Sequence, residues 1–256
     1  MLSIDTSTVY ALWKREITRL KRSPSRILGG LAMPVLFMVF LGTGFSSMNI
    51  NGMPAEMSYI QYLVPGIVGM TMLFSGSMAG MSLLWDKEHG FLKEVMVAPS
   101  SRLSIVLGRI AGGGTMSVVQ GLLVLLASFF LGFSISSIGG FIVGVVFLIL
   151  IAVTFIGMGM IFASTMHDSQ GFGMVMNLVI FPLFFLSGAI YPVSNLPKFL
   201  QYITYLNPLT YGINGMRASF IGVAKQSILL NLGTLLTFTA ILLGLGTHFF
   251  NKMEVS

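Results

Sequence analysis

The sequence predicts an all-α integral membrane protein with six transmembrane helices in a single domain, residues 1–256. Of these residues 55% are hydrophobic and only 9% are charged, whereas a soluble domain carries about 25% charged residues. Six apolar segments also reach the length of a spanning helix, which is roughly 17 to 25 residues. They are 27–46, 62–84, 104–131, 138–164, 172–191 and 228–250. Little polar sequence remains between them, so we expect no appended soluble domain.

Residues 1–26 predict a cytoplasmic amphipathic helix on the inner membrane surface. Val9, Trp13, Ile17 and Leu20 recur at helical spacing, and charged, mostly basic residues lie between them. This pattern places an apolar face in the interface and a basic face toward anionic lipid headgroups. A solvated basic tail that only sets the topology is the alternative. Pro24 would separate the helix from the first span.

The basic residues predict the topology. Cytoplasmic loops retain Lys and Arg near membrane ends, and with a cytoplasmic N-terminus only Lys198, Arg217 and Lys225 of the 14 basic residues fall outside. We therefore expect a multi-pass protein of the cell (cytoplasmic) membrane with both termini in the cytoplasm. Because the basic cluster adjoins an apolar span, membrane lipid is the expected partner and nucleic acid is not.

Glycines recur four positions apart inside the expected spans, a spacing that lets helix backbones approach closely. The alternative is that glycine is simply frequent in membrane helices. The pairs are Gly76 and Gly80, Gly108 and Gly112, and Gly140 and Gly144.

The longest internal polar segment, residues 85–102, lies on the expected cytoplasmic side. Phe91, Leu92, Val95 and Met96 would form the apolar stripe of a short helix, which Pro99 would end. Such a helix can present a mixed charged and apolar surface to a soluble partner. An ordinary connecting loop is the alternative.

The residue order in this segment resembles the first cytoplasmic loop of ABC-2 type permeases, the membrane-spanning subunits of ABC exporters. The matching residues are Glu88, Gly90, Leu92 and Glu94, then Pro99 with Ser101 and Arg102, then Leu107, Gly108 and Arg109. Phe91 and Arg109 depart mildly from the family, where a small polar residue and Lys are commoner. The resemblance implies a coupling helix seated on an ATP-binding subunit. The implied coupling residues are Glu88, Gly90, Phe91, Leu92, Glu94 and Arg102.

The segment 192–224 precedes the last expected span on the outer side. Its apolar stretches 196–206 and 209–221 are each too short to cross, and Asn207 and Pro208 interrupt them. We therefore expect two re-entrant half-helices. The stretch from Asn207, followed later by Arg217, also resembles the family. Asn207, Pro208, Tyr211 and Arg217 are candidates for an outer gate or an anchor, and Arg217 could be a snorkelling anchor or a gate contact.

No catalytic, cofactor-binding or metal-binding residue is expected in this chain. The residues 108–115 mimic a phosphate-binding loop, but Gly114 stands where that loop needs Lys. Asp168 lacks the facing carboxylate of an aspartyl mechanism, and His89 and His167 lack ligand-like spacing. ATP and Mg²⁺ are therefore expected in a partner subunit.

The resemblance implies the permease subunit of an ATP-driven exporter that works by alternating access. Its implied partners are an ABC ATP-binding subunit and a second permease copy or homologue, forming a dimer. The centres of the expected spans are almost free of charge, which suits an amphipathic or lipid-linked solute better than a small ion. An ATP-independent channel or secondary carrier is the alternative.

Overall fold

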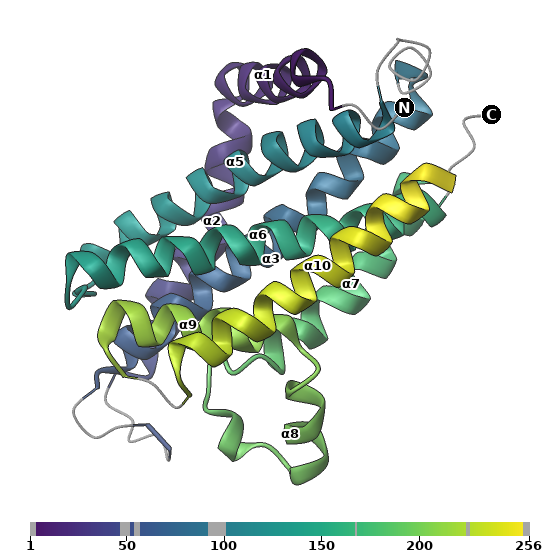
Figure 1. The fold of residues 1–256 in the computed structure, drawn as a ribbon. Helices are drawn as coiled ribbons and strands as arrows, with labels where there is room; N and C mark the ends of the chain where they lie inside the picture. The colour runs from purple at the N-terminus through teal and green to yellow at the C-terminus, as the bar shows by residue number, and fades with distance from the viewer. Residues whose placement is uncertain are drawn as a thin grey trace.

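The computed structural model describes residues 4–46, 52–53, 57–91, 101–166, 168–223 and 226–252, and the regular elements in these ranges are helices (Figure 1). The predicted all-α class is confirmed for this part of the chain. In order, the helices are α1 (Thr6–Arg22), α2 (Pro24–Gly44), α3 (Tyr59–Glu88), α5 (Arg102–Phe129), α6 (Ile138–Thr165), α7 (Ser169–Phe185), the 3-10 turn η1 (Val193–Asn195), α8 (Lys198–Thr204), α9 (Pro208–Ile221) and α10 (Ile228–Lys252).

Among the described residues, five helices are long and apolar enough to cross a membrane, namely α2, α3, α5, α6 and α10. The remaining predicted span corresponds to α7, which is apolar but has only 17 residues. A helix of this length measures about 25 Å, somewhat less than the roughly 30 Å of a hydrocarbon core. The span predicted to run to residue 191 therefore ends as a helix at Phe185, and Gly188, with φ of 76°, turns the chain soon afterwards.

The core of the bundle is built around α6, which packs against α3, α9 and α10. Phe147, Ile151 and Phe155 of α6 are fully buried there. Gly80 of α3 and Gly159 of α6 lie so close that a Cβ on either would overlap the other helix's backbone. These two helices therefore meet through backbone atoms rather than through interlocking side chains, as small residues allow in membranes.

The three glycine pairs predicted from their spacing all lie at close approaches. A Cβ on Gly76 would lie 2.8 Å from a carbonyl oxygen of α6, and one on Gly108 would lie 2.8 Å from Leu12 of α1. Gly140 faces the backbone of α9. Gly112 and Gly144 instead face side chains, those of Glu16 and Phe220. The packing interpretation of the spacing is confirmed.

Helix α1 packs against α5, as Figure 1 shows. Part of the apolar face predicted for α1 therefore contacts protein. The Trp13 indole donates to the Thr115 hydroxyl at 3.1 Å, and Leu12 is buried. Asp5 caps the helix, and its hydrogen bonds from the Thr8 hydroxyl and the Ser7 amide hold the pKa of its carboxyl below the ordinary value.

The first residue of α5 and the last turn of α10 meet at one end of the bundle, because Arg102 donates to the carbonyl oxygen of Asn251. The Asp5 amide donates to the Ser104 hydroxyl at 2.8 Å at the same end. The beginnings of α1 and α5 and the end of α10 thus meet here, and α3 ends on the same side of the bundle (Figure 1). We call this the α3–α5 end, and the opposite one the α9 end.

Candidate functional site

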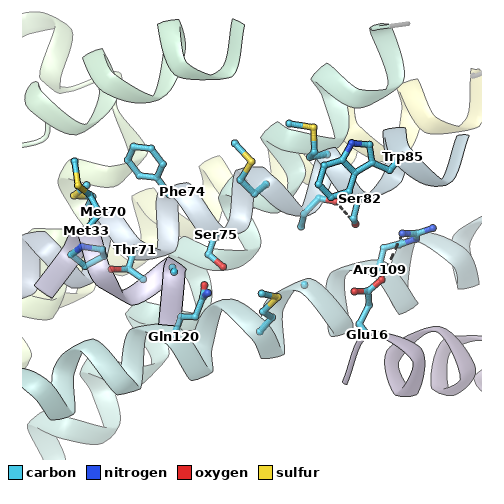
Figure 2. Close-up of a pocket in the computed structure, with 18 of the residues that line it drawn as sticks. Glu16, Met33, Met70, Thr71, Phe74, Ser75, Ser82, Trp85, Arg109 and Gln120 are labelled. Atoms are coloured by element: carbon cyan, nitrogen blue, oxygen red, sulfur yellow. Dashed lines mark hydrogen bonds and ion pairs between the residues drawn. The ribbon is translucent and has the colours of Figure 1, made fainter. Parts of the chain in front are cut away.

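A cavity of about 470 Å³ lies between α2, α3 and α5. Figure 2 shows its two long walls, formed by α3 and α5. Along α5 the lining residues are Arg109, Gly113, Met116 and Gln120, which recur every three or four positions and therefore share one helix face. The volume is within the range of small-molecule sites in proteins, roughly 300 to 1,000 Å³.

Most of the cavity wall is apolar and rich in methionine. Met33 of α2, Met70 and Met78 of α3 and Met116 of α5 line it, together with Phe74. Methionine is flexible and polarisable, so a surface built from it adapts to apolar groups of different shapes. This wall suits the apolar part of a ligand rather than a hydrated ion.

Isolated polar groups interrupt the apolar wall. Ser75 accepts a hydrogen bond from Ser117 at 2.9 Å, and Thr71 donates to a carbonyl of its own helix. Gln120 is only 5% exposed, and its amide makes no hydrogen bond to the described part of the chain. Its amide nitrogen lies above Gly30, where a Cβ would be 2.5 Å away. Gln120 is therefore held by packing and leaves its hydrogen-bonding capacity to the cavity.

Four charged side chains, Arg15, Glu16, Asp86 and Arg109, meet at the α3–α5 end of the cavity, and we call them the charged cluster. Arg15 donates to both carboxylate oxygens of Asp86, at 2.7 and 3.1 Å. Arg109 donates to the same carboxylate. The Asp86 carboxylate therefore joins α1, α3 and α5, and its bidentate contact with Arg15 is the stronger kind of ion pair.

The prediction that the charges of α1 face lipid headgroups is wrong for two of them, because Arg15 and Glu16 face α3 and α5. From the sequence alone, Arg109 is expected only to mark the cytoplasmic side and to follow the coupling loop, and Asp86 lies within that loop. The sequence signal for this cluster is that opposite charges occur near the inner ends of neighbouring spans. Ionisable groups at such positions usually pair with one another.

The coupling residues predicted after the second span are only partly described. Helix α3 continues through residues 85–88, so the boundary expected at residue 84 is four residues too early and a separate helix does not begin at Trp85. Gly90 adopts a left-handed φ of 76° just beyond the end of α3, the usual place of glycine at a helix end. Leu92 and Glu94 lie outside the described residues.

Two of the predicted coupling residues contact other helices. Glu88 accepts a hydrogen bond from the Ser169 amide, the first residue of α7, at 2.8 Å. The Phe91 ring lies 3.9 Å below the guanidinium carbon of Arg15. The segment that follows α3 is thereby attached to both α7 and α1. Arg102, which binds the end of α10, lies nearby in the sequence but contacts a different helix.

At the α9 end, the predicted break at Asn207 and Pro208 is confirmed. Asn207 is the N-cap of α9 and accepts from the Leu209 amide at 3.0 Å, while Pro208 occupies the first turn, where its missing N–H costs nothing. The Asn207 side-chain amide also donates to the Leu183 carbonyl at 2.6 Å. The Leu183 carbonyl lies in the last turn of α7, where carbonyl groups have no hydrogen-bond partner inside the helix.

The two predicted half-helices differ in burial. Helix α9 is buried against α3, α6 and α10. Tyr202 of α8 and Leu206, which follows α8, are instead more than two-thirds exposed, at 71% and 74%. Only α9 is enclosed by the spans. Tyr211 of α9 donates to the Tyr205 carbonyl at 2.9 Å and so fixes the link between the two helices.

Arg217 lies inside the bundle, 8% exposed. Its guanidinium donates to the carbonyl oxygens of Tyr62 and Gly188, at 3.1 and 3.2 Å, and more weakly to Asn214 at 3.4 Å. The Tyr62 hydroxyl also donates to Gly188 at 2.9 Å. These contacts fit the planar fork of arginine, and the side chain does not extend outward in the way a snorkelling anchor would.

Residues 108–115, which mimic a phosphate-binding loop in sequence, lie within α5. Their first glycines admit α1: Gly108 faces Leu12, and Gly112 faces the Glu16 stem. The glycine spacing is therefore explained by helix packing.

Comparison with known proteins gives consistent matches along the chain. A family model described as ABC-2 type transporter matches residues 7–221. The ycf38 transport permease of Pyropia yezoensis is 32% identical over 219 residues, covering 84% of this chain and 74% of the relative. YadH, an inner membrane transport permease of Escherichia coli strain K12, is 29% identical over 248 residues, 93% of this chain and 92% of the relative. Nodulation protein J of Neorhizobium galegae is 26% identical over 230 residues, with 88% and 86% covered.

Proposed function

The chain belongs to the ABC-2 type transporter family, and on that premise we propose that it is the permease subunit of an ATP-driven exporter. A separate ABC subunit would bind ATP and Mg²⁺ and hydrolyse the nucleotide. A second copy of this chain, or a homologue, would complete the membrane domain as a dimer. Both termini would be cytoplasmic, so that the α3–α5 end faces the ATP-binding subunit.

The solute in this proposal is amphipathic or lipid-linked, and the cavity supports this choice. Its walls are mainly apolar and carry few polar groups, such as Gln120 and Ser75. A small ion would require several oxygen ligands arranged around one point. A lipid-like molecule requires an apolar path with a place for its headgroup, which matches a methionine-rich wall that ends at the charged cluster.

The observation that carries the proposal is the attachment of the segment after α3 to two other helices. Glu88 binds the beginning of α7, and Phe91 lies under Arg15 of α1. Arg15 in turn binds Asp86, which also binds Arg109 at one end of the cavity. A partner that moved this segment would therefore move α1 and α7 relative to α5, and change access to the cavity. This is the kind of movement that alternating access requires.

Substitutions at Glu88 test this coupling. Glu88→Gln keeps an acceptor for the Ser169 amide but removes the charge, whereas Glu88→Lys removes the acceptor and reverses the charge. We expect Glu88→Lys to abolish ATP-dependent transport and to weaken co-purification with the ATP-binding subunit. Reversing the charge places like charges against each other at a docked surface, which weakens binding. Glu88→Gln should retain folding and part of the transport.

Two results would contradict the proposal. One is full ATP-coupled transport by Glu88→Lys in proteoliposomes, with the ATP-binding subunit still bound. The other is solute movement by the wild-type permease in vesicles without any ATP-binding subunit, which would indicate a channel or secondary carrier. Equal membrane insertion of all variants, measured by their yield in the membrane fraction, is the control.

A further inference from the structure

At one end of the cavity, two buried side chains have hydrogen-bonding atoms without a partner in the described part of the chain. Arg109 has a side chain that is 7% exposed, and its Nε and Nη1 have no hydrogen-bond partner in the described part of the chain. The Glu16 side chain is 13% exposed, and its Oε1 likewise has no hydrogen-bond partner among the described residues. Nη1 and Oε1 are 4.0 Å apart, too far for a hydrogen bond. Both residues line the cavity, as Figure 2 shows.

Buried polar atoms in proteins are nearly always paired, so an open donor facing an open acceptor indicates a place where a third group binds. A group between Arg109 and Glu16 must accept from the guanidinium and donate to the carboxylate. A hydroxyl does both through one oxygen, and an amide does both through its two ends.

The charge of the site selects against ions. The charged cluster is neutral as a whole, because it contains two arginines and two carboxylates. Asp86 binds both Arg15 and Arg109. An anion entering the gap would meet the Glu16 carboxylate, and a cation would meet the Arg109 guanidinium. Like charges brought together in a partly desolvated site oppose binding. An uncharged group meets neither penalty.

A second unpaired polar group lies farther along the same wall. Gln120 follows Arg109 by 11 positions on one face of α5, which is about 16 Å of helix. Met116 and Gly113 lie between them, and Phe74 lines the opposite side. The cavity therefore has a charged end at Glu16 and Arg109, an apolar middle and an isolated amide, Gln120, farther along.

We propose that the end of the cavity between Glu16 and Arg109 binds the uncharged headgroup of an amphipathic ligand through its hydroxyl or amide groups. The apolar part of the ligand extends along Met116 toward Gln120. This inference rests on the proposed function in one respect, because it takes the ligand to be the transported solute. The binding itself does not depend on an ATP-binding subunit and is measured without one.

Trp85 provides a reporter for the test, because it lines the cavity and the chain has only one other tryptophan, Trp13. A Trp13→Phe background, placed in phosphatidylcholine nanodiscs, leaves Trp85 as the only indole. The probes are monoacylglycerol, lysophosphatidic acid and a long-chain alkylamine, each brominated at the same position of the chain close to its headgroup, because Trp85 lies at the Glu16–Arg109 end of the cavity (Figure 2). They present a diol, a phosphate and an ammonium group, and bromine quenches indole fluorescence only at short range.

We expect monoacylglycerol to quench Trp85 at concentrations about tenfold lower than the other two probes, because only the diol avoids a like charge. Equal quenching by all three would show partition into the lipid around the protein and overturn the proposal. Tighter binding of the phosphate or the ammonium probe would overturn it as well.

Glu16→Gln sharpens the test, because it leaves Arg109 with an uncharged neighbour. The preference should then shift by about tenfold toward lysophosphatidic acid, since the anion no longer meets a carboxylate. Asp168→Asn is the matched control: it makes the same change of charge at an exposed N-cap outside the cavity, and Asn caps a helix as well as Asp does. An unchanged preference in Glu16→Gln, or the same shift in Asp168→Asn, would contradict the assignment.

Adding the ATP-binding subunit with ATP separates a carried solute from a resident lipid. Release of the monoacylglycerol, seen as recovery of Trp85 fluorescence, is expected for a carried solute. Retention during turnover would assign the site to a resident lipid and overturn the substrate part of the inference. If the headgroup preference held but no solute moved with ATP, the exporter proposal would fail while the binding site stood.

Discussion

The guanidinium of Arg217 lies over the ring of Tyr62, with its central carbon 3.8 Å from the ring centroid, and donates to the carbonyl oxygen of the same residue. One side chain of α9 thus binds both the face and the backbone of one residue of α3. Through Gly188 it also holds the chain that follows α7. At the α9 end of the bundle, the buried guanidinium of Arg217 therefore joins α9 to α3 and to the chain after α7.

Arg217→Lys should lower stability even though the charge is kept. An ammonium cannot donate to two separate carbonyls and stack on a ring at once, and each hydrogen bond to a charged group contributes about 1.5 to 3 kcal/mol. We expect a lower midpoint of thermal unfolding in detergent and loss of transport. Asn214→Ala removes only the longest contact of Arg217 and should behave almost as wild type. Wild-type unfolding and transport in Arg217→Lys would remove Arg217 from any gate.

The charged cluster should show strong coupling between Asp86 and Arg109. Asp86→Asn leaves the buried Arg109 without its main partner, and breaking a buried pair costs about 3 to 5 kcal/mol. The double variant Asp86→Asn with Arg109→Gln should recover most of that loss. Arg15→Gln should cost less, since the Arg15 side chain is 32% exposed and the Arg109 side chain only 7%. A thermal-unfolding double-mutant cycle measures this, and purely additive effects would contradict it.

Gly80→Ala should disrupt the contact between α3 and α6. The added methyl would overlap the Gly159 carbonyl, which is backbone and cannot rotate away, and overpacking of this kind costs about 1 to 3 kcal/mol or more. Gly244→Ala is the matched control, because nothing lies within 4 Å of its Cβ position in α10. We expect reduced folded yield for the first and wild-type yield for the second, measured by size-exclusion chromatography. Equal yields would contradict the backbone contact.

The expected topology is tested by single cysteines, because the chain has none of its own. A cysteine at Asn195, in η1 near the α9 end, should react with an impermeant maleimide in intact cells. One at Lys252, at the end of α10, should react only after permeabilisation. Reaction of both, or of neither, before permeabilisation would place both positions on one side of the membrane and contradict the single crossing by α10 between them.

The features that sequence predicted well are local ones. Helix length and apolarity identify spans because each helix must satisfy its own backbone in lipid, and Asn207 with Pro208 marks a helix start wherever it occurs. The close approaches at Gly80 and Gly108 are also predictable from sequence, because glycines on one helix face leave room for any neighbouring helix. The sequence does not, however, identify the helix that fills each space.

The features that sequence missed depend on residues far apart in the chain. The pairing of Arg15 with Asp86 joins positions 71 apart, and no periodicity connects them. The end of α3 was misplaced because residues 85–88 are polar, which suggested a loop, although Gly90 was a usable stop signal. The cavity arises from three helices that together enclose it, so no single segment could have predicted it.

The shortness of α7 has a consequence for the surrounding lipid. With 17 residues, it falls about 5 Å short of an average hydrocarbon core if it crosses as proposed. A bilayer meets a short helix by thinning beside it, at a cost of a fraction of a kcal/mol per ångström. Acyl chains next to α7 would therefore be compressed, and headgroups of the two leaflets would lie closer together there than elsewhere around the protein. Hydrophobic mismatch would then make this flank the thinnest part of the bilayer around the protein, and the degree of thinning should follow the chain length of the host lipid.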